Sequence, residues 1–151
     1  MSRWLNCHFF QEYKRLDNLC KDIFDAEKGV STYIINMEEY TGGNVLVPYW
    51  YKDLKRLKRY WHIRNLIAHE TNVYEEDYCT LEDENWILDF YQKILTGQDP
   101  LSIYQNALKQ QESNQKNKYI LQIHMIKIMI IMIVTMTMIM IVKIIQKKSV
   151  I

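Results

Sequence analysis

The residues best suited to chemistry lie in one short stretch, residues 61–70, which reads Trp-His-Ile-Arg-Asn-Leu-Ile-Ala-His-Glu. Within it, Arg64 supplies a guanidinium, Asn65 an amide and His69 an imidazole. A guanidinium can bind phosphate through paired hydrogen bonds, and histidine gains and loses a proton near neutral pH. We therefore take these three residues as the candidate catalytic site, acting on an anionic ligand.

A long basic helix must position this stretch, and Pro48 can lead into that helix. Apolar residues recur at the helical period along one arc, which we expect to face a core. They are Trp50, Leu54, Leu57, Trp61 and Ala68. A second stripe is polar and suits a phosphate-rich ligand. It consists of Lys55, Lys58, His62, Asn65 and His69.

Arg64 interrupts this pattern, because at about 100° per residue it projects into the apolar arc. A charge in that place needs a partner. One alternative is a structural ion pair with an acidic residue on a neighbouring helix. The other is an arginine that binds an anion in a cleft, and the sequence leaves both open.

The run from Arg64 to His69, Arg-Asn-Leu-Ile-Ala-His, resembles the signature of the HEPN superfamily, which has an arginine, a polar residue, three variable residues and a histidine. That superfamily contains toxin ribonucleases, anticodon nucleases and RNA-guided RNases. The run ends a basic amphipathic helix after two earlier helical segments, which is where that all-helical fold usually carries it. The resemblance covers about residues 3–112. It implies an all-α, HEPN-like bundle of four to five helices.

The resemblance also implies a mechanism, a metal-independent cleavage of RNA in which the substrate's 2′-hydroxyl is the nucleophile and no cofactor is needed. Arg64 would hold the phosphate, His69 would act as acid or base, and Asn65 would order them by hydrogen bonding. Arg64 and His69 are about 140° apart around an ideal helix, so one helix does not aim both at one phosphate. The HEPN solution is a homodimer whose paired motif helices form a composite cleft.

RNA binding would have to rely on a local basic patch. The formal net charge is +1, but the chain through Lys118 holds 15 Lys and Arg against 18 Asp and Glu, a net charge of −3. Residues 52–64 hold six Lys or Arg, with only Asp53 as a compensating charge within that stretch. We expect this patch to bind RNA, with a solvated helix surface as the alternative. The expected RNA-binding residues are Lys55, Lys58, Arg59 and His62.

Two helices are expected before the motif helix. The first covers about residues 5–26 and ends by Gly29. Its expected inward residues are Phe9, Tyr13, Leu16, Cys20 and Ile23. Ser31 or Thr32 can cap the second, shorter helix. The glycine pair at residues 42–43 and the residues up to Pro48 indicate a loop or a short extended piece.

Further helices are expected after the motif. Acidic residues spread over residues 70–84 indicate a solvated loop. Thr80 and Asp83 resemble a capping box that begins a fourth helix, which runs up to Gly97. Asp99-Pro100 is a suitable start for a fifth helix. We expect that helix to end in a polar linker over residues 113–118.

The C-terminal part differs sharply from the helical domain of residues 1–112. Residues 119–145 are dominated by Ile and Met, and a short basic tail, residues 146–151, follows. Lys127 and Lys143 confine the uncharged core to 15 residues, about 22 Å of helix against a hydrocarbon layer of roughly 30 Å. If both lysines snorkel, a tilted transmembrane helix of about 39 Å is feasible. The alternative is a low-complexity end produced by a frameshift.

Other features of the sequence indicate the cellular compartment and limit the chemistry that is expected. Three cysteines at unpaired spacings argue against a disulfide framework or a zinc site. The N-terminus lacks the apolar run of a secretory signal. We therefore expect a cytoplasmic domain anchored to a membrane through residues 119–145. His69-Glu70 does not continue as the HExxH zinc pattern, so no metal site is expected.

Three functional readings follow. The first is a membrane-tethered, homodimeric HEPN endoribonuclease of a toxin or anti-phage type, with an antitoxin protein as a possible partner. The second is a non-catalytic HEPN-like module that binds RNA or a protein at the membrane. The third is a purely structural bundle in which Arg64 forms an ion pair.

Overall fold

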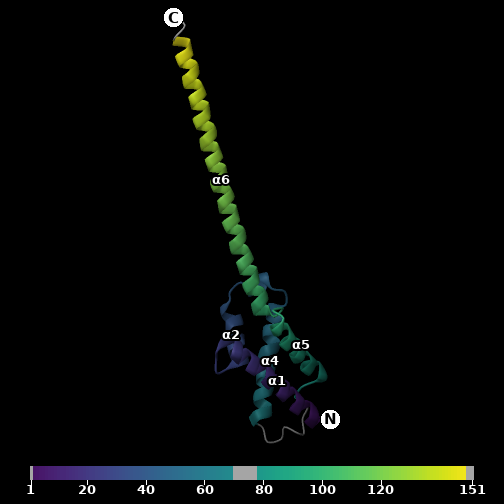
Figure 1. Cartoon of the computed structure of the whole chain (residues 1–151). Coiled ribbons are helices and arrows are strands. Elements are labelled where there is room, and N and C mark those ends of the chain that lie inside the picture. The colour runs from purple at the N-terminus through teal and green to yellow at the C-terminus, as the bar shows by residue number, and fades with distance from the viewer. Residues whose placement is uncertain (1, 70–77, 149–151) are drawn as a thin grey trace. The chain divides into compact units, whose positions relative to one another are not determined.

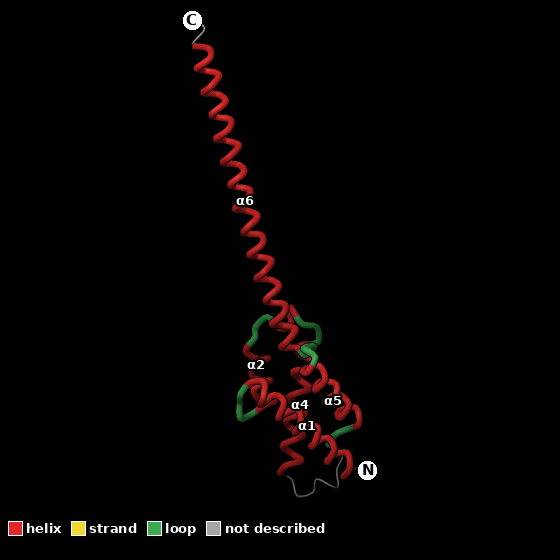
Figure 2. The backbone as a smooth tube through the Cα atoms, viewed as in Figure 1, coloured by secondary structure: helices red, strands yellow, loops and turns green. Residues whose placement is uncertain are grey.

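The computed structural model describes residues 2–69 and 78–148, and every regular element within these ranges is a helix (Figures 1 and 2). The expected all-α class is confirmed. The chain divides into two compact units, Met1–Ala107 and Leu108–Ile151. In the first unit, α1 contacts α2, α4 and α5, and α2 also contacts α4 (Figure 1).

Helix α1 (Ser2–Phe24) buries one stripe of side chains against its neighbours. Four of the five expected inward residues are buried: Phe9, Tyr13, Leu16 and Cys20. Burial raises the pKa of the Cys20 thiol to about 12, so Cys20 is a neutral core residue. Ile23 was expected inward but is 54% exposed, because Phe24 is turned inward instead and contacts Tyr33 edge to face. The helix ends before Asp25, which has φ +48°, and not at Gly29.

Helix α2 (Gly29–Glu39) begins without the expected cap from Ser31 or Thr32. The cap comes from α1: the Val30 backbone N–H donates to Asp17 Oδ1 over 2.9 Å. Gly29 allows this close approach, since a Cβ atom there would lie 1.9 Å from the Asp17 carbonyl oxygen. The α1–α2 contact is therefore a backbone contact that a larger residue would prevent.

Helix α3 (Gly43–Leu46) is a short helical turn where a loop or extended piece was expected, and α4 (Trp50–His69) follows it. The buried face of α4 is rotated relative to the expected arc. It consists of Trp50, Leu54, Leu57, Tyr60 and Ile63. Trp61 is 44% exposed and Ala68 is exposed, so their expected core positions are wrong. Tyr60 takes the inward place because its ring packs against Phe9 and Trp86.

Helix α5 (Leu81–Leu95) begins at the expected capping box of Thr80 and Asp83 and is followed by Gly97 at φ +67°. Asp83 and Glu84 were expected in a solvated loop, but both are buried in the first turn of α5. The reason is pairing across the fold. Arg59 donates two hydrogen bonds to the Asp83 carboxylate, at 2.7 and 3.1 Å, and His8 Nδ1 lies 2.7 Å from Glu84 Oε1.

Helix α6 (Pro100–Lys148) begins where expected, with Asp99 accepting hydrogen bonds from the backbone N–H groups of Leu101 and Ser102. Residues 113–118 are helical, so the expected end of the helix at that linker is wrong. This stretch, Ser-Asn-Gln-Lys-Asn-Lys, contains no glycine or proline to end the helix. The helical domain was expected to extend to residue 112, but residues 108–112 belong to the second unit.

The apolar part of α6 is long enough and apolar enough to cross a membrane, judged by length and composition. Its most apolar window has a mean hydropathy of 2.7, and none of it is buried inside the chain. An exposed apolar surface of this extent needs a cover other than water. A lipid bilayer would provide one.

Replacing Gly29 by alanine tests the backbone contact between α1 and α2. We expect Gly29→Ala to lower the free energy of unfolding by about 2–4 kcal/mol, because the new methyl group overlaps the Asp17 carbonyl. Urea unfolding of the full chain in detergent micelles, followed by tryptophan fluorescence, measures this. Gly42→Ala is the control, since its Cβ would make an ordinary 3.7 Å contact with Tyr104. Equal losses in the two variants would contradict the prediction.

We expect Asp83 to make the free energy of unfolding depend on pH. Burial by itself raises the pKa of this carboxyl, but hydrogen bonds from Thr80, Arg59 and Tyr60 outweigh it, so the pKa lies below its ordinary value. A lowered pKa in the folded state stabilises the fold above the unfolded-state pKa, about 3.9, and this contribution is lost as pH falls through the folded-state pKa.

We therefore expect Asp83→Asn to cost about 1.5–3 kcal/mol at pH 7, a difference that shrinks below about pH 4. Asp89→Asn on the same helix is the control: its ion pair with Lys93 is exposed, so we expect a change below about 0.5 kcal/mol. A pH-independent difference between wild type and Asp83→Asn would contradict the assignment.

Candidate functional site

Arg64 lines two neighbouring clefts on the first unit. The first, of about 280 Å³, lies between α1, α2 and α4, and the second, of about 220 Å³, lies between α1 and α4. Tyr13, Asp17 and Lys21 line both clefts with Arg64, and Asn65 lines the first. The structure thus brings together two of the three candidate catalytic residues, Arg64 and Asn65.

The Arg64 guanidinium is held by its neighbour in the sequence, because Nη1 donates to Asn65 Oδ1 over 2.9 Å. Within residues 2–69 and 78–148, Arg64 forms no ion pair. Arg64 is half-buried and, at about 100° per residue, falls within the arc of α4 that holds Trp50, Leu57 and Tyr60. It lies about one turn beyond Tyr60, close to the end of the helix, where its side chain lines the two clefts.

Asp17 is the carboxylate that lines both clefts, and each of its oxygens already has a partner. Oδ1 accepts from the Val30 N–H, and Oδ2 lies 2.9 Å from Lys21 Nζ. The Tyr13 hydroxyl stays neutral, since burial raises its pKa and Asp17 adds to the rise. Arg64 therefore keeps donors for an external anion.

The charge around Arg64 favours such a ligand. Basic side chains outnumber acidic ones along the two clefts. The basic ones are Lys14, Lys21, Lys28 and Arg64, and the acidic ones are Asp17 and Glu27. A cleft with this excess raises the local concentration of anions.

His69 is the last residue of α4 and is exposed. It lines neither of the clefts that Arg64 lines. A single chain therefore does not bring the candidate acid–base residue to the candidate phosphate-binding residue. The residues that follow His69, 70–77, lie outside the described part of the chain.

The basic patch is less available than its sequence indicates. Arg59, one of the expected RNA-binding residues, is engaged by Asp83 and therefore ties α4 to α5. Arg56 pairs with Glu82, and Lys58 pairs with Glu38. Asp53 is the only carboxylate within this stretch, but helices distant in the sequence supply further carboxylates to the patch. Lys55 and His62 are exposed, as RNA binding would need.

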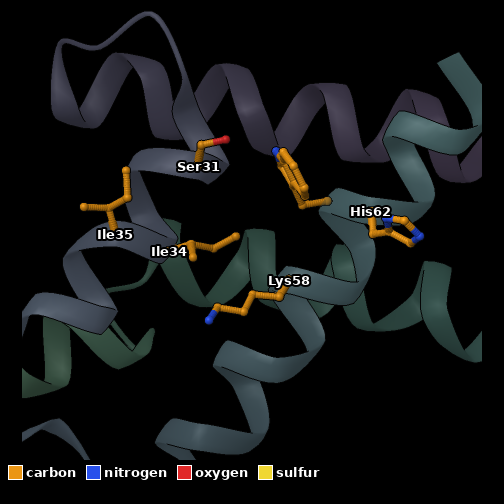
Figure 3. Close-up of a pocket in the computed structure, with 6 residues that line it drawn as sticks. Ser31, Ile34, Ile35, Lys58 and His62 are labelled. Atoms are coloured by element: carbon orange, nitrogen blue, oxygen red, sulfur yellow. The ribbon is translucent and has the colours of Figure 1, made fainter. Parts of the chain in front are cut away.

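The sequence missed a third cleft, of about 380 Å³, between α2 and α4 (Figure 3). Its walls are mainly apolar, and its six lining residues are Ser31, Ile34, Ile35, Lys58, Trp61 and His62. Trp61 and Ser31 also line the first Arg64 cleft, so the two clefts adjoin. This cleft was not expected, because Trp61 was assigned to the core.

The sequence matches the family described as Family of unknown function (DUF6548) over residues 7–122. The chain belongs to this family. No curated protein and no solved structure matches it. The region of the DUF6548 match contains Arg64, Asn65, His69 and all three clefts, and it ends just inside the apolar segment of α6.

The availability of Arg64 in this DUF6548 protein can be tested by stability. Because Arg64 has no acidic partner in the described part of the chain, we expect Arg64→Ala to change the free energy of unfolding by at most about 0.5 kcal/mol. Arg59→Ala is the matched control and should cost about 1.5–3 kcal/mol, since it strips two hydrogen bonds from buried Asp83. If both variants lose the same stability in urea unfolding, Arg64 is a structural residue.

Proposed function

We propose that this DUF6548 protein is a metal-independent endoribonuclease of HEPN type that acts as a homodimer. The observation that carries the proposal is the Arg64–Asn65 pair. The guanidinium has no carboxylate partner in the described ranges, donates a 2.9 Å hydrogen bond to Asn65, and lines a cleft with Lys21 and Lys28. That is the arrangement a phosphodiester needs.

The reaction needs no group beyond the RNA and these side chains. A base removes the proton of the 2′-hydroxyl, the 2′-oxygen attacks the adjacent phosphorus, and the bond to the 5′-oxygen breaks. An acid supplies the proton to the leaving 5′-oxygen, and a 2′,3′-cyclic phosphate remains. In this proposal Arg64 stabilises the charge on the phosphate, Asn65 fixes the guanidinium, and His69 transfers the protons.

A second copy supplies the missing geometry. His69 is exposed at the end of α4 and lies outside the Arg64 clefts of its own chain. A two-fold dimer that pairs the α4 helices would present His69 of each copy to Arg64 of the other. Lys55, Lys58 and His62 would then hold the flanking RNA.

The membrane and a regulatory partner complete the proposal. The apolar part of α6 would anchor the protein to a membrane with the helical domain in the cytoplasm, and a toxin of this kind would be held inactive by an antitoxin protein. Lysines flank the apolar segment on both sides, so the positive-inside rule does not set its orientation.

A second candidate function is a non-catalytic module that binds RNA or a protein at the membrane. The position of His69 favours it, because this imidazole does not reach the Arg64 clefts within one chain. It predicts salt-sensitive RNA retention that depends on Lys55 and Lys58, without cleavage.

Cleavage of RNA in the presence of excess chelator separates the two candidates. The full chain in non-ionic detergent is incubated with total RNA, and the ends of the fragments are analysed. We expect wild type to leave 2′,3′-cyclic phosphates, and Arg64→Ala and His69→Ala to be at least about 100-fold slower.

Arg15→Ala and His124→Ala are the matched controls, because Arg15 is an exposed residue paired with Glu12 and His124 is an exposed residue of α6. Both should cleave like wild type. Equal loss of RNA in all five proteins, or none in any, would reject the nuclease.

A further inference from the structure

Trp61 forms the wall between two clefts of different character. On one side is the apolar cleft between α2 and α4, and on the other is the polar cleft that Arg64 and Asn65 line. The indole is 44% exposed, and within the described ranges it makes no ring stacking or cation–π contact. A large aromatic surface therefore remains available next to the cleft that Arg64 lines.

Spacing on α4 sets what can use this surface. Lys58, Trp61 and Asn65 lie at i, i+3 and i+7, and residues three or four apart are neighbours on a helix surface. The order along this stripe is a cation, an aromatic ring and the polar partner of Arg64. A single strand of RNA has the same alternation of phosphate, base and phosphate.

The lining of the apolar cleft fits a base. Ile34 extends from α2 into the space above Lys58, Ile35 also lines the cleft, and the His62 ring is turned away from the two isoleucines (Figure 3). The ion pair of Lys58 with Glu38 is between half-exposed side chains, and such pairs contribute little, so a phosphate can compete for this lysine. The volume, about 380 Å³, leaves room for a planar ring against the indole.

We infer that the cleft beside Trp61 takes an unpaired RNA base whose neighbouring phosphate is bound at Arg64. This inference rests on the RNA-binding part of the proposed function and not on cleavage. Stacking on an aromatic side chain requires a base that is not stacked in a duplex. Trp61 therefore restricts the site to single strands, loops and ends, and Ser31, which lines both clefts, can hydrogen-bond to the edge of the base.

The test measures binding of short RNA by the full chain in non-ionic detergent, in a His69→Ala background that prevents the proposed cleavage. We expect Trp61→Ala to weaken binding of a single-stranded oligonucleotide by about tenfold, and Trp61→Phe, which keeps a stacking ring, by much less. Trp4→Ala is the matched control, because Trp4 is an exposed tryptophan that stacks on His8 and lines none of the three clefts.

An abasic scan makes the test specific for stacking. Removing one base at the position that Trp61 contacts should weaken binding to the parent protein and have no further effect on Trp61→Ala, because the two changes delete the same interaction. A fully paired hairpin stem should bind weakly to every variant. Equal losses for Trp61→Ala and Trp4→Ala, or an abasic scan with no position that depends on Trp61, would overturn the inference.

Two further outcomes separate this inference from the proposed function. Trp61-dependent binding by a chain that never cleaves RNA would reject the nuclease and leave the base subsite in place. Cleavage by wild type together with unchanged binding by Trp61→Ala would reject the base subsite and leave the nuclease in place. If Trp61→Ala instead changes the sedimentation of the protein without any abasic effect, a second copy fills the cleft and the inference is wrong.

Discussion

The Asp17 carboxylate determines how the candidate site is built. One oxygen accepts the Val30 N–H and so caps α2 from α1, and the other pairs with Lys21. The contact is close enough that only glycine fits at position 29. Asp17 is paired with Lys21 and forms no ion pair with Arg64, although both side chains line the same clefts. One carboxylate therefore joins two helices beside a guanidinium that remains available for a ligand.

The other cations of α4 form two groups. Arg59 is tied to buried Asp83, and Arg56 reaches Glu82 and lies over the Trp86 ring, so both fix α4 against α5. Lys55 and Lys58 face outward on the same helix. These contacts lie on the α5 side of the helix, whereas the three clefts lie where α4 meets α1 and α2.

Local signals predicted the fold class and several helix starts. The Thr80–Asp83 capping box and the Asp99 cap depend on residues a few positions apart, so the sequence displays them directly. The rotation of α4 was missed because Tyr60 is turned inward by Phe9 and Trp86, which are distant in the sequence. The Asp17 cap and the apolar cleft beside Trp61 were missed for the same reason, because each depends on contacts between different helices.

The central claim is that Arg64 of one copy acts with His69 of the other. The most direct measurement mixes an Arg64→Ala chain with a His69→Ala chain in the same micelles and assays RNA cleavage. A mixed dimer contains one intact pair, so random mixing should restore about a quarter of wild-type activity. If the mixture stays as inactive as either variant alone, the two residues do not act across a dimer and the account is contradicted.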